Sequence, residues 1–407
     1  MEDFQGLLSL LMIYIFIFFW TKKNPQTKYF LLVAFFLRSL CVLFDQYDFV
    51  NLPDSKSDAK KFEHLASEFS KNEGFLVVFD FFKNDSLLIS KIISIFYTIF
   101  GESKMLAKSI SVALGTASVY LVYNLCTLMW DINSAKKAAW VTALFPSLIL
   151  YSSLTLRESY IVFFLLIGLI GIVKFIRNNS FASFSQALLS FYVLIFFHGP
   201  LVLGGFVFLF YLALKLINEQ IRKSDNFKIN IFSLLFLFTS LTIVTLFLTN
   251  NFEIPYLGRI NTLFELDESF DKINTYMTGT ASYPSWLKIN YSYELFTKGI
   301  FKIFYFLYSP FMWDIKSYIH LFGLFDGILY FIFTIYVIRN RYYIWKNPIT
   351  RLFILIFVCY LIMYGLGVGN FGTAIRHRSK FIVILIVLAA PMIHKFIFST
   401  KNKLYKK

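Results

Sequence analysis

Long apolar runs separated by short polar segments dominate this chain of 407 residues. A helix of about 20 apolar residues is long enough to cross the ~30 Å hydrocarbon layer of a membrane. The pattern therefore predicts an all-α integral membrane protein with about eleven transmembrane helices. We expect these helices at residues 4–20, 29–45, 104–130, 137–153, 159–176, 184–198, 201–217, 229–249, 318–338, 351–367 and 379–398.

The connections between the expected helices alternate in length and charge. One set is short and rich in Lys or Arg, and of the 24 acidic residues only Asp131, Glu219 and Asp225 fall in it. The other set includes two long segments, residues 46–103 and 250–317. Because Lys and Arg in short loops hold their side of a membrane protein in the cytoplasm, we expect a multi-pass protein of the cell membrane. Its C-terminus is then cytoplasmic and its long loops lie outside.

Two shorter apolar segments lie inside the long outer loops, at residues 86–100 and 300–313. The first carries a polar stripe at helical spacing, which is typical of a helix lying in the membrane interface. We expect both segments to be interfacial helices. The chain then divides into a transmembrane module (1–249, with outer loop 46–103), an outer loop (250–317) and C-terminal helices (318–407). The stripe consists of Ser86, Ser90, Lys91, Ser94 and Thr98.

Composition supports the membrane interpretation. The chain is 57% hydrophobic, with a mean hydropathy of +0.64, which is more apolar side chain than one soluble core can bury. The net charge of +15 lies largely in the short loops, so we expect no nucleic-acid partner. Cys41, Cys126 and Cys359 all lie in apolar stretches and predict neither a disulfide nor a metal site.

Charged residues from distant parts of the chain fall on the expected outer face. We select Asp58 and Glu158 as candidate catalytic residues, and Arg376, Arg378, Arg157 and His198 as candidate ligands of a phosphate. Arginine stays charged and pairs with phosphate bidentately. A carboxylate within reach of a hydroxyl can remove its proton. These residue types suit sugar transfer from a lipid-linked phosphate.

Each candidate has a simpler explanation. Asp54 follows Pro53 and is typical of a turn, and His198 precedes Gly-Pro and can close one. Glu158 can serve only to stabilise a helix N-terminus, and Arg376 and Arg378 can bind lipid headgroups. Arg38 is buried in an expected span and needs a partner, so we expect it to form a structural pair.

Three stretches resemble the GT-C superfamily of membrane glycosyltransferases, especially the branch with protein mannosyltransferases and lipid A aminoarabinose transferases. They are "DAKKFEHLA", "FYTIFGESKMLAKSISVALGTASVYLVYNL" and "AKKAAWVTALFPSLILYSSLTLRES". By position, Asp58 matches the family's outer-loop carboxylate, which acts as the base or orients it, and Glu158 matches its second acidic position. The family's frequent Asp-Glu pair is absent, and His198 stands where related chains often carry Arg-Pro.

The resemblance implies a GT-C-like fold and a glycosyltransferase acting on the extracytoplasmic face in the biosynthesis of cell-surface polysaccharide. Its donor would be a polyprenyl-linked sugar and its acceptor a glycan, a lipid or a protein. Membrane lipids would be further partners. No cofactor is implied with certainty, and a divalent metal remains an alternative.

Two other functions stay open at this point. The second half, with "YPSW", "SPFMWD" and "GTAIRHR", resembles bacterial O-antigen polymerases, which would move a whole glycan from a polyprenyl diphosphate. A lipid-linked-glycan flippase is a remoter alternative. A flippase would need charged residues at mid-depth along the spans, and usually repeat symmetry. Of the charged residues in the expected spans, only Arg38 and Lys215 qualify.

The expected topology can be tested with reporter fusions. A reporter inserted near Lys136 should report the cytoplasm, and one near Ser282 should report the exterior. Both reporters on one side of the membrane would contradict the alternation of basic and long loops on which the eleven-helix arrangement depends.

Overall fold

The computed structural model describes residues 2–83, 87–222, 274, 277, 279–291 and 293–393. In these ranges the chain forms helices together with an isolated bridge between Ser282 and Asn370. The long helices are α1 (Glu2–Lys23), α2 (Lys28–Gln46), α5 (Lys104–Met129), α8 (Arg157–Asn178), α9 (Phe181–Phe197), α10 (Val202–Arg222), α14 (Tyr318–Arg339) and α16 (Pro348–Gly367).

Shorter helices connect and cover these. They are α3 (Lys60–Asn72), α4 (Leu88–Phe100), α6 (Ile132–Leu144), α7 (Pro146–Tyr151), α13 (Glu294–Tyr308), α15 (Arg341–Lys346), α17 (Phe371–Ser379) and α18 (Ile382–Ala389). Brief helical turns are η1 (Pro25–Thr27), η2 (Ser55–Ala59), η3 (Gly74–Asp80), η4 (Gly199–Leu201), η6 (Ser285–Leu287), η7 (Met312–Asp314) and η8 (Ala390–Met392).

Six of the described helices are long and apolar enough to cross a membrane. They correspond to the expected spans at α1, α2, α5, α8, α14 and α16. The expected spans at α9 and α10 fall on shorter apolar helices, Phe181–Phe197 and Gly199–Lys215. The expected span 229–249 lies outside the described residues. The structure thus supports a multi-pass membrane protein with six candidate spans.

Two expected spans are interrupted. The segment 137–153 is divided between α6 and α7 at Pro146, because proline lacks the N–H that a continuous helix requires. The segment 379–398 begins at the end of α17, and after Phe381 it continues as α18. Residues of α18 are at most 2% exposed, so it is a central core helix rather than a lipid-facing one.

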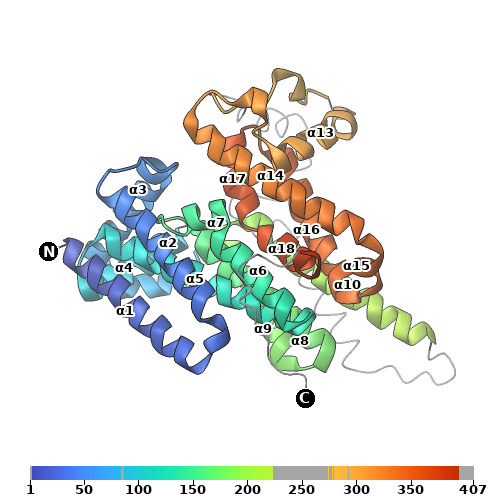
Figure 1. The fold of residues 1–407 in the computed structure, drawn as a ribbon, viewed down its shortest axis with the longest axis horizontal. Helices are drawn as coiled ribbons and strands as arrows, with labels where there is room; N and C mark the ends of the chain where they lie inside the picture. Colours follow the sequence, from blue (N-terminus) through green and yellow to red (C-terminus); the bar gives the residue numbers. More distant parts are fainter. Residues whose placement is uncertain are drawn as a thin grey trace, which may run out of the picture.

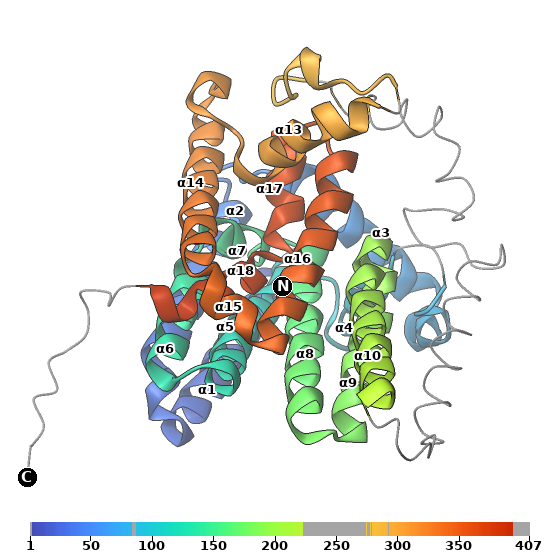
Figure 2. The same ribbon diagram turned by 90° about the vertical axis from the view of Figure 1, so that its right-hand side faces the viewer.

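Helix α18 lies between the two halves of the molecule. It packs against α5 and α6 on one side and against α14 and α16 on the other. Figure 1 shows the N-terminal helices on one side of it and the helices from α13 onward on the other, and Figure 2 shows α14 and α16 running roughly parallel to α8 and α10. The Trp130 indole donates a hydrogen bond to the carbonyl of Val387, at 2.9 Å, across this contact.

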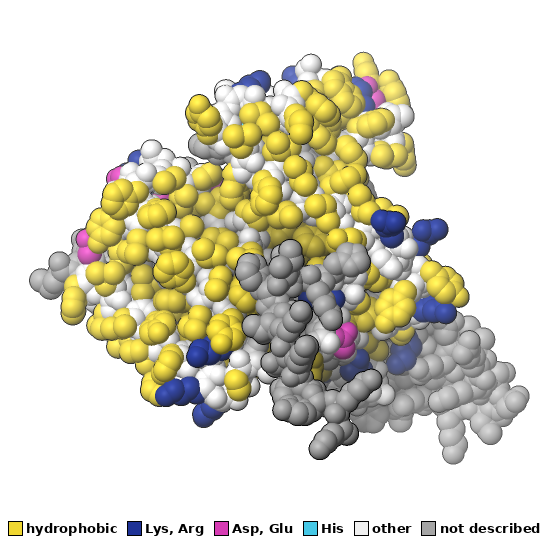
Figure 3. All heavy atoms as spheres, viewed as in Figure 1, with side chains coloured by type: hydrophobic (Ala, Val, Ile, Leu, Met, Phe, Trp, Pro, Cys, Tyr) yellow, Lys and Arg dark blue, Asp and Glu magenta, His cyan; other side chains and the backbone are white. Residues whose placement is uncertain are grey.

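The outside of the molecule is largely apolar. Figure 3 shows hydrophobic side chains over most of one face, with Lys and Arg near its margins, at the top, on the right and at the lower left. On α1, Phe16 is 67% and Met12 is 58% exposed, while the helix ends in Lys22 and Lys23. A broad apolar surface bounded by basic residues is what a bilayer stabilises and water does not.

The part of the polar stripe that lies in α4 faces protein, whereas Ser86 lies outside the described residues. Ser90, Lys91 and Ser94 are at most 2% exposed. The Ser90 hydroxyl donates to the carbonyl of Phe62 on α3, and the Lys91 amine donates to the carbonyl of Asp80. The stripe therefore satisfies backbone carbonyls of the first long loop, and Ile99 and Phe100 on the same helix are exposed instead. The stripe does not face water, as an interfacial helix would require.

Arg378 links three helices of the C-terminal half. Its side chain is fully buried and pairs with the buried Asp326 of α14 at 3.0 Å. It also donates to the carbonyls of Phe306, Leu307 and Ser309, where α13 ends. Because the last carbonyls of a helix have no partner within it, Arg378 satisfies the end of α13 and fixes α13, α14 and α17 to one another.

Breaking this buried ion pair should destabilise the fold. Arg378→Met leaves Asp326 charged, buried and unpaired, a change that costs about 3–5 kcal/mol in other proteins. We expect a clear fall in the thermal unfolding temperature in detergent, and a partial recovery when Asp326→Leu is added. The control is Arg339→Met on the same α14, because Arg339 is exposed. An unfolding temperature equal to the parent's for Arg378→Met would contradict the structural role.

Candidate functional site

Arg376 joins two carboxylates from distant parts of the chain. Its Nε donates to Glu158 Oε1 at 2.9 Å, and its Nη1 donates to Asp58 Oδ2 at 2.5 Å. The partners are 218 and 318 positions away in the sequence. Asp54 lies close enough to be influenced by the charges of Arg376, Asp58 and Glu158. We call Asp54, Asp58, Glu158 and Arg376 the Arg376 cluster.

The local structure of α17 determines which arginine reaches the cluster. Asn370 caps the helix by accepting hydrogen bonds from the N–H groups of Gly372 and Thr373. Successive residues of a helix point about 100° apart, so Arg376 and Arg378 project to nearly opposite sides. Arg376 faces α8 and η2, and Arg378 faces α13 and α14. The segment expected to be an outer loop, "GTAIRHR", is therefore a helix with two differently occupied faces.

Glu158 lies in the first turn of α8, where a carboxylate is stabilised by the unpaired N–H groups and the helix dipole. Its side chain is 2% exposed, and besides Arg376 it has Lys380 Nζ at 3.6 Å. Its second oxygen, Oε2, has no hydrogen-bond partner in the described part of the chain. The position near a helix N-terminus, the simpler explanation, is confirmed, and the carboxylate also takes part in the cluster.

Asp58 differs from Glu158 in its access to solvent. It lies in η2, and its side chain is 46% exposed while that of Arg376 is 11% exposed. Asp58 is therefore accessible at the surface of the protein, whereas Glu158 lies behind it. The Arg376 cluster has one open side and one closed side.

Burial lowers the pKa of Arg376, but the neighbouring carboxylates of Glu158, Asp54 and Asp58 outweigh it and raise the pKa above its ordinary value. The guanidinium therefore stays charged. Its third nitrogen, Nη2, is buried without a hydrogen-bond partner among the described residues. An unpaired buried donor is costly, and an oxygen-rich ligand would satisfy it.

A second layer of polar side chains lies behind Glu158. Lys380 Nζ is 2.6 Å from His377 Nδ1, and His198 Nδ1 is 3.0 Å from the Tyr364 hydroxyl. The rings of His198 and His377 are 5.3 Å apart. Burial, with Lys380, Arg376 and Arg157 nearby, lowers the pKa of His377 well below its ordinary value. His377 is therefore neutral, and its Nδ1 accepts the hydrogen bond from Lys380.

The expected phosphate ligands have different positions. Arg157 is 7% exposed, lies 5.2 Å from the centre of the Phe62 ring and donates to the carbonyl of Phe197. His198 belongs to the second layer, beside Tyr364. Arg378 lies outside the cluster, because its donors are bonded to Asp326 and to carbonyls of α13. We therefore correct the prediction that Arg378 is a phosphate ligand, because its side chain has structural partners. Arg376 stays the candidate phosphate ligand of the two.

Two members of this region were not selected from the sequence as functional. Asp54 is expected in a turn, which it does form, and Lys380 falls inside the expected span 379–398. The available signal for Asp54 is its closeness in sequence to Asp58, in the same long loop. Among the described residues, no group of three or more His, Cys, Asp or Glu is arranged to hold a metal ion.

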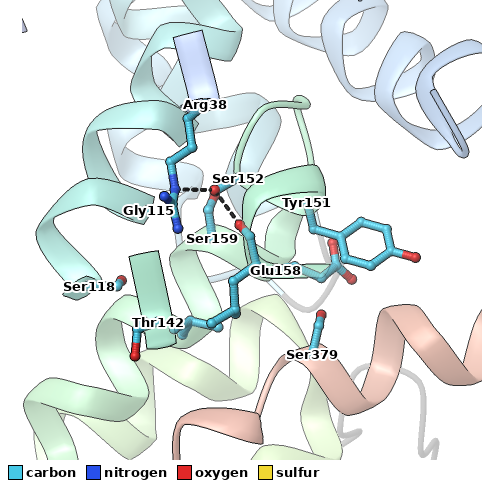
Figure 4. Close-up of a pocket in the computed structure, with 11 residues that line it drawn as sticks. Arg38, Gly115, Ser118, Thr142, Tyr151, Ser152, Glu158, Ser159 and Ser379 are labelled. Atoms are coloured by element: carbon cyan, nitrogen blue, oxygen red, sulfur yellow. Dashed lines mark hydrogen bonds between the residues drawn. The ribbon is translucent and has the colours of Figure 1, made fainter. Parts of the chain in front are cut away.

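A small cavity adjoins the buried side of Glu158 (Figure 4). Its volume is about 20 Å³, enough for a water molecule. Arg38 lines its other end and donates to Ser152 Oγ at 2.7 Å and to the carbonyls of Ala34 and Ala143. The structural role expected for Arg38 is thus confirmed, with a hydroxyl and carbonyls as its partners. The remaining lining residues include Ser118, Tyr151, Thr142, Ser159 and Ser379.

The chain matches no protein-family model, and no curated protein matches it.

Replacing Arg376 should reveal its double pairing. Arg376→Lys keeps the charge but not the planar fork that serves two carboxylates, whereas Arg376→Met leaves Glu158 buried without this partner. We expect unfolding temperatures in the order parent, Arg376→Lys, Arg376→Met. The same pair of substitutions at the exposed Arg351 should have little effect. Equal unfolding temperatures for both Arg376 variants and the parent would contradict the ion pairs.

Proposed function

We propose that this protein is an integral-membrane glycosyltransferase of GT-C type, which transfers a sugar from a polyprenyl-phosphate-type donor to a glycan, lipid or protein acceptor outside the cytoplasm. The observation that carries the proposal is the Arg376 cluster. It combines a solvent-accessible carboxylate with a buried, permanently charged guanidinium that has an unused donor. The apolar surface of the helices around it suits a substrate whose tail lies in the bilayer.

Each part of the cluster has a chemical use in this reaction. When the bond between the sugar and its phosphate breaks, negative charge develops on the phosphate oxygen. A cation positioned there lowers the barrier. Arg376 is the best-placed cation, with Lys380 and Arg157 behind it. A carboxylate of the first long loop can accept the proton of the attacking hydroxyl.

The resemblance to GT-C glycosyltransferases supports the same assignment. The two residues that match the family's outer acidic positions, Asp58 and Glu158, are the two that pair with Arg376. Nothing in the sequence places them together, since they are 100 positions apart. A polymerase would depend mainly on arginines and less on a loop aspartate. The presence of both carboxylates beside one arginine therefore favours a single-sugar transferase that uses a carboxylate as its base.

The proposal can be tested in a strain from which the gene is deleted. We expect the lipid-linked or surface glycans to lack one sugar, and the parent protein to restore it. Arg376→Ala removes the cation and should lower transfer by at least about 100-fold, as the loss of one stabilising donor does elsewhere. Arg351→Ala, an exposed change on α16, should restore the sugar as the parent does.

The glycan profile distinguishes the alternatives. A complete repeating unit that fails to polymerise would favour the polymerase. An unchanged profile in the deletion strain would contradict both functions.

A further inference from the structure

Asp54 has an unusual backbone conformation at the edge of the Arg376 cluster. Its φ is +66°, in the left-handed region that side chains with a Cβ rarely adopt. Aspartate tolerates this region better than most residues, but the conformation still costs free energy. It is held by the turn that precedes η2, in which the Asp54 carbonyl accepts hydrogen bonds from the N–H groups of Ser57 and Ala59. Such strain at a site is a reason to ask what the side chain does.

The Asp54 carboxyl faces charges from several elements. Asp58 belongs to η2, Glu158 to α8 and Arg376 to α17, and Tyr151 of α7 also lies within range of its charge. Arg157, His377 and Lys380 stand further back, around Glu158. Burial raises the pKa of Asp54 above its ordinary value, Arg376 opposes this rise, and Glu158 and Asp58 add to it.

Asp58 lies in a contrasting environment. Its Oδ2 accepts a short, charge-assisted hydrogen bond from Arg376. The Asp58 carboxylate is therefore engaged in holding the guanidinium of Arg376. Asp54 has no ion pair within 4.0 Å in the part of the chain that the structure describes. The two loop carboxylates thus differ in their partners: Asp58 is bonded to Arg376, whereas the carboxylate of Asp54 is left without an ion pair among the described residues.

We propose that Asp54 is the group that accepts the proton of the acceptor hydroxyl, and that Asp58 holds Arg376 in position beside it. This inference rests on the function proposed above and divides its two loop carboxylates between roles. As the acceptor oxygen bonds to the anomeric carbon, the bond from that carbon to the phosphate oxygen breaks and its electron pair stays on the phosphate. The hydroxyl proton moves to the carboxylate of Asp54, and Arg376 faces the phosphate.

The two roles predict opposite changes in stability. At a pH above the pKa of Asp54 in both the folded and the unfolded protein, its carboxyl is ionised in both states. Because the pKa is raised in the folded protein, the ionised carboxylate lowers the stability of the folded state. Asp54→Asn removes that charge and keeps a residue that tolerates a positive φ. The unfolding temperature should rise above the parent's at pH 8, and the difference should shrink toward pH 5. Asp58→Asn removes a partner of Arg376 and should lower the unfolding temperature at pH 8.

Asp48 offers a matched control. It lies in the same loop, also has a positive φ of 54°, and forms an exposed ion pair with Lys56 at 3.1 Å. Asp48→Asn should leave both the unfolding temperature and its pH dependence close to the parent's. The comparison of the three variants needs no substrate.

Transfer activity tests the chemical role. In membranes of the deletion strain that contain the endogenous donor, Asp54→Asn should lower transfer about 10²–10⁴-fold and flatten the acid side of the pH profile. Asp58→Asn should keep the fall of transfer activity at acidic pH and should mainly weaken the apparent affinity for the donor. Asp48→Asn should follow the parent.

The outcomes separate the two proposals. Parent-like transfer by Asp54→Asn would overturn the role of Asp54 and leave the glycosyltransferase proposal standing. A lower unfolding temperature for Asp54→Asn at pH 8 would also overturn it, since Asp54 would then be a stabilising partner of Arg376. Absence of transfer by the parent would overturn the proposed function, and the stability comparison would still report the electrostatics of Asp54.

Discussion

The ion pair between Arg378 and Asp326 is the constraint on which the arrangement of the C-terminal half depends. Both side chains are fully buried, and a charge in such a place is tolerated only when it is paired and hydrogen-bonded. The pair fixes the rotation of α17 about its axis, because Arg378 must point toward α13 and α14. Arg376, two residues earlier, then has to point toward α8 and η2. The position of the candidate site follows from a structural contact on the opposite face of the same short helix.

The Arg376 cluster combines strong and weak interactions. Glu158 is almost fully buried, so its bond to Arg376 is little screened, and loss of Arg376 would leave this carboxylate with Lys380, at 3.6 Å, as its remaining ion-pair partner. Asp58 is nearly half exposed, and the screening by water makes its contribution to stability modest. A cluster of this kind keeps its arginine fixed from the inside while leaving its outer carboxylate accessible. That division suits a site that must be rigid at the charge and open to a substrate.

The apolar exterior and the buried polar interior are consistent with a membrane as the solvent. Exposed phenylalanines on α1 would be unfavourable in water, whereas the central α18 has apolar residues because it packs against other helices. Several polar side chains inside are satisfied by backbone carbonyls, as Lys91, Ser90 and Arg38 are. Hydropathy alone does not distinguish α1 from α18, since both are apolar for different reasons.

The sequence by itself determined the helical class, the six long apolar helices and the basic residues that end several of them, because hydropathy is a local sum over neighbouring residues. It also identified Asp58, Glu158 and Arg376 as residues of interest, partly through a resemblance. The division of the segment 137–153 at Pro146 could have been inferred, since proline interrupts a helix wherever it falls in the interior. Only the tertiary structure decided that Arg376 and Arg378 have different partners, that the stripe of α4 faces protein and that Asp54 lies beside the cluster. Each of these depends on which distant segment packs against which face of a helix, and contacts across 218 or 318 residues leave no pattern in the local sequence.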